Sequence, residues 1–223
     1  AQLSHVVDAI ALSLQEKGLK RGDRVSLLIP PGNNLTAAAY AVLKAGGVVV
    51  VADAGLGAAG MTRAVKASDP QWIIGEVPGL TLARGAGWPG RRISVTPLNA
   101  LTRRLLGVET SMTEMSRRWV KSHEKVETPH LDDDAAVLFT SGSTGPAKGV
   151  RYTHRALGAL ATVLQRHFDV KPGTGLVAGF PPFALLGPGI GASSVTPNMS
   201  VTKPRTLTAR CLLYTSDAAD ERS

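Results

Sequence analysis

The chain has 223 residues, enough for one large domain or two small ones. Hydrophobic residues make up 43% of it and aromatic residues only 4%, which excludes a disordered chain and favours a core of small aliphatic side chains. Its single cysteine, Cys211, excludes an internal disulfide framework, while the net charge of +8 leaves nucleic acid to be considered as a partner.

Hydrophobic periodicity predicts alternating helices and strands in the first part of the chain. The expected helices cover residues 4–17, 33–45 and 58–67. The expected strands cover residues 24–29, 48–51 and 72–74. The continuous apolar run of the second strand is typical of a strand that is covered on both faces. Strands that alternate with helices predict right-handed crossovers, so we expect an α/β fold with a mostly parallel sheet and flanking helices.

The middle of the chain gives weaker signals. Residues 79–97 are rich in glycine and arginine, and we expect a loop or an irregular hairpin there. Residues 112–126 mix charged and apolar side chains and predict a surface helix. The acidic triplet 132–134 is either a metal site or a solvated turn, and the lack of further ligands at suitable spacing favours the turn. The apolar run 135–139 then predicts a buried strand.

The most informative segment follows that strand. Residues 140–149 read TSGSTGPAKG. Glycines let the backbone bend so that several N–H groups point at one anion, hydroxyls add rotatable donors, and a lysine adds positive charge. The second glycine and final hydroxyl of the common P-loop are absent, as are the spaced glycines of dinucleotide-binding motifs. The pattern favours a polyphosphate site over a Gly/Ser-rich surface loop.

This segment resembles the signature of the adenylate-forming (AMP-binding) superfamily, which includes acyl-CoA synthetases, nonribosomal peptide adenylation domains and luciferases. Nine of its ten positions fit, and Ala147 replaces the usual proline. Residues 18–25 and 45–48 look like the opening subdomain of acyl-CoA synthetases, whereas residues 53–57 resemble the long-chain and β-lactone-forming branch. The resemblance implies a partial N-terminal domain of the adenylate-forming fold over residues 1–210.

The resemblance also implies the reactants and the roles of single residues. ATP and Mg²⁺ serve the formation of an acyl-adenylate, and CoA accepts the acyl group in the second step. Lys148 would be the catalytic residue that steers pyrophosphate, and Thr140 would also contact Mg²⁺. The residues implied to bind the nucleotide are Thr140, Ser141, Gly142, Ser143, Thr144, Gly145, Lys148 and Gly149. Neither Ser141 nor Ser143 has an evident base, which favours phosphate donors over nucleophiles.

The remaining native-looking sequence predicts a helix over residues 154–167 and a strand over residues 175–179. Residues 180–191 form an apolar segment with many glycines and prolines that resembles the acyl-pocket stretch of the family. Phe183 takes the position that often gates the substrate carboxylate. A gating role and a packing role for Phe183 both stay open.

Three functions are compatible with these features. The first is activation of a carboxylic acid, expected to be a fatty acid, followed by ligation to CoA. The second is an olefin β-lactone synthetase that adenylates a β-hydroxy fatty acid, which residues 183–187 and 196–199 resemble. The third is a non-catalytic nucleotide-binding module. The expected partners are therefore a small carboxylic acid, ATP and CoA.

Other expectations concern the ends of the chain and its surroundings. Residues 211–221 resemble the translation of a transposase-type sequencing adapter, so we interpret residues 211–223 as a non-native tail, with a genuine polar tail as the alternative. The downstream motifs of the family are missing, so we expect this fragment alone to be inactive. No signal peptide or transmembrane segment is expected, which favours the cytoplasm. The basic residues are spread without interleaved aromatic residues, so nucleic acid is not an expected partner.

Overall fold

The computed structural model describes residues 2–52, 56–118, 125–140, 148–171, 173–178, 181–195, 197 and 208. The chain divides into two compact units. The first unit comprises Ala1–Pro30 and Ala37–His154, and the second comprises Pro31–Thr36 and Arg155–Ser223. Residues 211–223, interpreted above as a non-native tail, lie outside the described residues.

A seven-stranded sheet organises the first unit, with the strand order β5-β4-β3-β1-β2-β6-β7. Six neighbouring strands run parallel, and only β7 runs antiparallel to β6. The strands are β1 (Arg24–Leu28), β2 (Val48–Ala52), β3 (Trp72–Gly75), β4 (Arg91–Ser94), β5 (Val108–Ser111), β6 (Asp134–Thr140) and β7 (Lys148–Thr153). This arrangement confirms the predicted α/β fold with a mostly parallel sheet.

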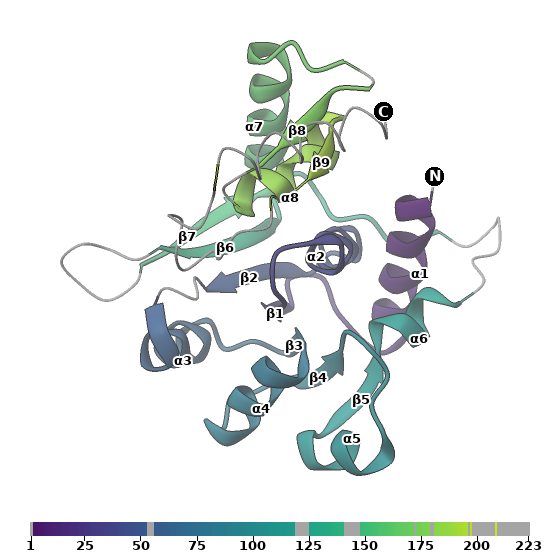
Figure 1. Ribbon diagram of the computed structural model, residues 1–223, viewed down its shortest axis with the longest axis vertical. Coiled ribbons are helices and arrows are strands. Elements are labelled where there is room, and N and C mark those ends of the chain that lie inside the picture. Colours follow the sequence, from purple (N-terminus) through teal and green to yellow (C-terminus); the bar gives the residue numbers. More distant parts are fainter. Residues whose placement is uncertain are drawn as a thin grey trace. The chain divides into compact units, whose positions relative to one another are not determined.

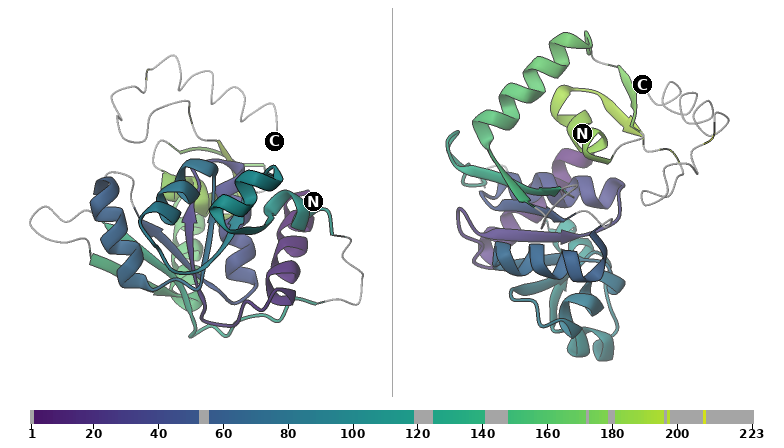
Figure 2. Two further views of the ribbon diagram at one scale, coloured as in Figure 1. Left: turned by 90° about the horizontal axis from the view of Figure 1, so that it is seen from below. Right: turned by 90° about the vertical axis from the view of Figure 1, so that its left-hand side faces the viewer.

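Helices cover both faces of this sheet (Figure 1). From β1 the chain moves to β2 on one side, and it then returns past β1 to add β3, β4 and β5 in turn on the other side. Because the crossovers are right-handed, this reversal places α2 on one face of the sheet and the next three helices on the other. The first unit contains α1 (Gln2–Glu16), most of α2 (Asn33–Lys44), α3 (Gly57–Ser68), α4 (Val77–Gly85), α5 (Ala100–Leu106) and α6 (Met112–Ser116). Figure 2 shows the same layers from two further sides.

The core beneath α3, α4 and α5 joins these helices to the sheet. Ile73 on β3 and Val108 on β5 pack with residues from all three helices. The fully or nearly fully buried members are Val65, Ile73, Leu80, Ala83, Trp88, Leu106 and Val108. Because these side chains come from consecutive crossovers, the apolar runs of the sequence specify both the strands and the helices that cover them.

The expectation of a loop over residues 79–97 is wrong, because this segment forms α4 and β4. Gly79 lies within the helix, and a Cβ there would be 2.7 Å from Leu28 Cβ and 3.1 Å from the Leu28 carbonyl oxygen. Gly90, with φ +106°, lies just before β4. The first glycine permits close helix–strand contact and the second permits a turn, so neither indicates an extended loop.

The expected surface helix over residues 112–126 is also wrong for most of its length. α6 ends at Ser116, and residues 125–130 are not helical. A capping box between Ser111 and Glu114 starts α6, directly after β5. The short elements α5 and β5 and the antiparallel strand β7 were not predicted, because none carries a long apolar repeat.

The second unit contains a smaller set of elements. These are α7 (His154–His167, from Arg155 onward), β8 (Gly175–Val177), α8 (Pro181–Ile190) and β9 (Ser193–Val195). β8 and β9 pair in parallel. The predicted helix over residues 154–167 is confirmed. Within the described part of the chain, no helix is both long and apolar enough to cross a bilayer.

Candidate functional site

The Gly/Ser-rich segment connects β6 to β7. Thr140 is the last residue of β6 and Lys148 the first of β7, and the two are register partners across the antiparallel pair. Ser141, Gly142, Ser143, Thr144 and Gly145 lie outside the described residues, as do the side chains of Thr140 and Lys148. The backbone therefore brings the two ends of the segment together, and the roles assigned to these side chains stay predictions.

The position of this connection in the sheet is informative. β6 runs parallel to β2, with Ala52 opposite Phe139, so β6 ends where β2 ends. The carboxyl ends of parallel strands gather at one edge of a sheet, and ligands of open α/β sheets bind outside that edge. The segment between Thr140 and Lys148 starts from this carboxyl edge (Figure 1).

Gly149 has a steric role that the sequence did not reveal. It is the register partner of Phe139. A Cβ at Gly149 would lie 3.1 Å from both Cε1 and Cζ of the Phe139 ring and 3.0 Å from Val137 Cγ1. The ring thus occupies the space that a side chain at position 149 would need. The sequence carried no signal for this role, because it depends on the register of β6 and β7.

At the other end of this hairpin the acidic triplet takes part in a turn. The Asp133 carboxylate accepts a 2.5 Å hydrogen bond from Arg21 Nη2 and a 2.7 Å bond from the His130 backbone N–H. The Arg21 guanidinium holds the pKa of Asp133 below its usual value. The Asp133 carbonyl accepts from the backbone N–H of His154 at 3.0 Å. These contacts confirm the predicted turn.

Asp134 pairs with Arg151 at 3.4 Å, so the next carboxylate also has a structural partner. Among the described residues, no group of three or more His, Cys, Asp or Glu side chains could hold a metal ion. The metal role of Thr140 stays a prediction.

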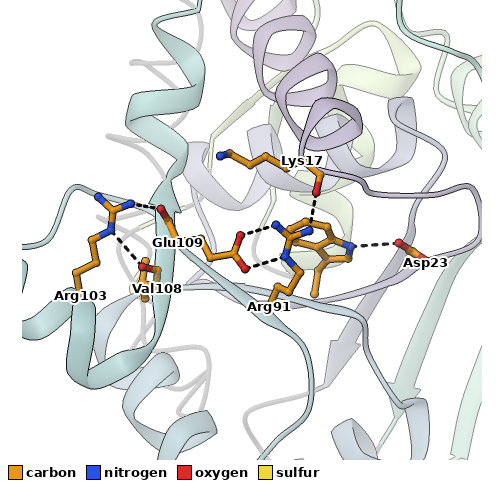
Figure 3. A network of polar contacts seen from close by, with 7 residues as sticks. Lys17, Asp23, Arg91, Arg103, Val108 and Glu109 are labelled. Atoms are coloured by element: carbon orange, nitrogen blue, oxygen red, sulfur yellow. Dashed lines mark hydrogen bonds and ion pairs between the residues drawn. The ribbon is translucent and has the colours of Figure 1, made fainter.

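The opposite, amino edge of the sheet carries a polar network (Figure 3). Arg91 donates two hydrogen bonds to Glu109, at 2.7 and 2.6 Å, and one to the Lys17 carbonyl at 2.5 Å. Its guanidinium carbon lies 4.1 Å from the ring centroid of Trp72, whose Nε1 donates to Asp23 Oδ2 at 3.2 Å. This network ties α1, β3, β4 and β5 together at the edge remote from the Gly/Ser-rich segment.

Phe183 lies in α8, and its side chain is outside the described residues. Gly187 of the same helix faces β9, where a Cβ would overlap Ser194 Oγ. At least one glycine of the predicted acyl-pocket stretch therefore permits close helix–strand packing. The gating role of Phe183 stays a prediction.

Comparisons with known proteins agree with this architecture. Residues 1–187 match the family model of the AMP-binding enzyme. The chain is 34% identical over 213 residues to olefin beta-lactone synthetase of Xanthomonas campestris pv. campestris, covering 95% of this chain and 38% of that protein. It is 27% identical over 183 residues to long-chain-fatty-acid–CoA ligase FadD13 of Mycobacterium tuberculosis, covering 82% of this chain and 35% of the relative.

Solved structures share the fold. The o-succinylbenzoate CoA synthetase MenE of Bacillus subtilis, in complex with the acyl-adenylate intermediate OSB-AMP, has a TM-score of 0.67 at 16% identity, covering 97% of this chain and 52% of that one. The chain spans little more than a third of each of the two curated relatives. The family match over most of its length shows that the chain belongs to the AMP-binding enzyme family.

Proposed function

We propose that this member of the AMP-binding enzyme family forms the phosphate-binding part of an enzyme that joins a carboxylic acid to AMP. The observation that carries the proposal is the pairing of Thr140 with Lys148, the strand residues that flank the Gly/Ser-rich segment, at the carboxyl edge of a parallel sheet. A segment of hydroxyls, glycines and one lysine at this edge suits a nucleotide triphosphate. The family match supports the same substrate.

In the proposed reaction a carboxylate oxygen attacks the α-phosphorus of ATP. One P–O bond forms to the acid, the bond between the α-phosphorus and its bridging oxygen breaks, and pyrophosphate leaves with the bonding electrons. Two anions must approach each other, so positive charge and oriented N–H and O–H donors lower the barrier. Lys148 would neutralise the departing pyrophosphate, and the segment from Thr140 to Gly145 would surround the β- and γ-phosphates.

Thr140 would help to hold Mg²⁺, which, when bound, would supply further positive charge to the phosphates. Gly149 would serve this site indirectly. The lack of a Cβ at Gly149 leaves room for the Phe139 ring across the strand pair from which the segment starts. A phosphate-binding segment needs such a base, because oriented donors are effective only when they do not reorganise during the reaction.

The second step differs between the two relatives. Identity and coverage are higher for the β-lactone synthetase than for the CoA ligase. We therefore infer a β-hydroxy acid as the first candidate substrate. Its own hydroxyl oxygen would attack the acyl carbon of the adenylate and displace AMP, closing a four-membered lactone. Ligation of a fatty acid to CoA is the alternative, in which the thiol displaces AMP.

The decisive experiment is pyrophosphate–ATP exchange by a full-length parent enzyme that carries this segment. Lys148→Ala should lower the exchange rate about 100-fold, the equivalent of roughly 3 kcal/mol for one lost electrostatic contact in a preorganised site. Lys66→Ala, at an exposed lysine of α3, is the matched control and should exchange like the wild type. An unchanged rate in Lys148→Ala would remove the proposed role of Lys148.

A second assay separates the two acceptors. The same enzyme is given ATP and a β-hydroxy fatty acid without CoA, and the products are identified by mass spectrometry. A β-lactone with stoichiometric AMP supports ring closure. Product that forms only after CoA is added, and carries CoA as a thioester, supports ligation instead.

A further inference from the structure

One exposed surface of the first unit is not used by the proposed reaction. On α5, the side chains of Leu101 and Leu105 are 70% and 62% exposed. They stand four residues apart and therefore share one face of the helix. Leu106 on the other side is buried in the core. The helix thus presents two leucines to the outside while it is anchored from within.

The helix that carries these exposed leucines, α5, is capped at both ends. Asn99 caps the start of α5, where its side chain accepts from the Thr102 backbone N–H at 2.8 Å. Gly107 ends the helix in the left-handed conformation, with φ +66°. Arg103 Nε donates to the Val108 carbonyl at 3.2 Å. Caps at both ends and a link to β5 hold α5 in place, so the leucines are not exposed through fraying.

Basic residues outnumber acidic ones in and around α5. Residues 77–108, which include α4 and α5, contain five arginines and no lysine, histidine, aspartate or glutamate. The arginines are Arg84, Arg91, Arg92, Arg103 and Arg104. Arg91 pairs with Glu109, and Arg103 lies close enough to Glu114 for its charge to lower the pKa of that carboxylate. Helices α4 and α5 contact each other, and they carry the exposed side chains of Arg84, Arg103 and Arg104.

The arginines at the α4 end are close to one another. Arg92 Nη2 donates to the Trp88 carbonyl at 2.9 Å, which places its guanidinium near the end of α4. Burial lowers the pKa of Arg92, and the positive charge of Arg84 lowers it further. Arg84 and Arg92 therefore lie near each other at this end of α4, and Arg84 is the exposed member of the two.

We propose that this outer face of α5 docks on an anionic lipid surface. Leu101 and Leu105 enter the headgroup region, and the surrounding arginines contact lipid phosphates and carboxylates. Exposed apolar side chains flanked by basic ones are the combination that peripheral membrane surfaces bind, and each basic residue near such a surface strengthens binding. The proposal does not depend on the proposed reaction.

Two other occupants fit the same surface less well. A second copy of the chain would bring two sets of arginines together, and the like charges would repel. Single-stranded nucleic acid binds through aromatic stacking platforms, whereas the only aromatic residue in 77–108 is Trp88, which is 2% exposed. An anionic bilayer satisfies both the leucines and the arginines.

The test is sedimentation of the 223-residue chain with vesicles. Vesicles of phosphatidylcholine alone are compared with vesicles containing about 30% phosphatidylserine, each in about 0.1 M and about 0.5 M NaCl. We expect binding to the anionic vesicles at low salt, and its loss at high salt and on neutral vesicles. The double variant Leu101→Ser with Leu105→Ser should bind about tenfold more weakly, and Arg104→Gln about fivefold more weakly.

Matched controls use exposed residues elsewhere. Leu131→Ser changes a leucine that is 58% exposed before β6, Val163→Ser changes a valine that is 61% exposed on α7, and Arg63→Gln changes an exposed arginine of α3. All three should bind like the wild type, and circular dichroism should confirm that every variant is folded. The salt and lipid comparisons on the unaltered chain remain decisive even if a variant does not fold.

Four outcomes would overturn the proposal. The first is no binding to anionic vesicles, and the second is equal binding to neutral ones. The third is an equal loss of vesicle binding in the α5 variants and the controls, which would indicate non-specific adsorption. The fourth is that the chain does not bind vesicles but self-associates or binds a single-stranded oligonucleotide, and that the α5 variants abolish this binding. Such a result would assign the surface to a second copy of the chain or to nucleic acid.

Discussion

Removing the Arg91 side chain is expected to weaken the first unit through several contacts at once. Arg91 connects Glu109 on β5, the carbonyl of Lys17 after α1 and the ring of Trp72 on β3 (Figure 3). These elements are far apart in the sequence. The substitution Arg91→Ala leaves the strand β4 intact and deletes only the connections that its side chain makes.

The size of the effect follows from the exposure of these groups. The side chains of Arg91 and Glu109 are 44% and 36% exposed, so solvent screens their bidentate pair and limits it to about 1 kcal/mol. Stacking on Trp72 adds roughly 0.5–1 kcal/mol, and the hydrogen bond to the Lys17 carbonyl adds about 1 kcal/mol. Ordering a long side chain offsets part of this sum. We expect Arg91→Ala to lower the free energy of unfolding by about 2 kcal/mol.

Urea unfolding followed by tryptophan fluorescence reports on the first unit, because Trp72 and Trp88 belong to it and are each only 2% exposed in the folded state. A double-mutant cycle with Glu109→Gln should give a coupling free energy of about 1 kcal/mol. Arg91→Lys keeps the charge but loses the planar fork, and should restore less than half of the loss. Arg63→Ala on α3 is the matched surface control and should stay within about 0.5 kcal/mol of the wild type.

A coupling free energy below roughly 0.3 kcal/mol would refute the reasoning, because additivity within that limit is typical of residues that do not interact. A loss in Arg63→Ala as large as in Arg91→Ala would refute it too. The effect would then come from the change in net charge and not from the network.

Two further predictions concern the same unit. The hydrogen bonds from Arg91 hold the pKa of Glu109 below its ordinary value of 4.5, so the ionised Glu109 stabilises the fold fully above about that pH and loses this effect as the pH falls through the lower folded-state pKa. Urea titrations should therefore show Glu109→Gln to be less stable than the wild type at neutral pH and equally stable in strong acid. A difference in stability that persists in acid would contradict this. On α4, Gly79→Ala should destabilise the protein by about 1–3 kcal/mol, because the new Cβ meets the Leu28 backbone. A Cβ at Gly85 would have no neighbour within 4 Å, so Gly85→Ala should be neutral or stabilising by up to about 1 kcal/mol. Equal unfolding midpoints for the two variants would contradict the steric argument.

The sequence was sufficient where a single element carries its own repeat. The apolar run 135–139 predicted β6, and the spaced apolar residues of α7 predicted that helix, with nearly their observed bounds. It was insufficient where glycine serves a distant contact. Gly79 suggested a loop, but its purpose is the approach of α4 to Leu28, which lies far away in the sequence. Local patterns cannot distinguish a glycine that bends the chain from one that makes room for a neighbour.

The same limit applies to the candidate site. The residue types of segment 140–149 predicted its chemistry and its position after a strand. The return strand β7 was missed, because β7 begins with Lys148 and Gly149, and a strand that starts in this way has no alternating apolar pattern. Gly149 was assigned to the nucleotide, while its contact with Phe139 follows only from the register of the hairpin.

The position of β6 beside β2 has a consequence for how the protein is made. The ribosome releases β3, β4 and β5 between Ala52 and Asp134, and all three join the sheet on the far side of β1. The valine-rich β2 therefore remains an edge strand of the nascent sheet, unpaired on one side, until β6 has been synthesised. Such edges capture other chains, so slow translation or early termination ahead of Asp134 should favour aggregation, and a chaperone present during synthesis should relieve it.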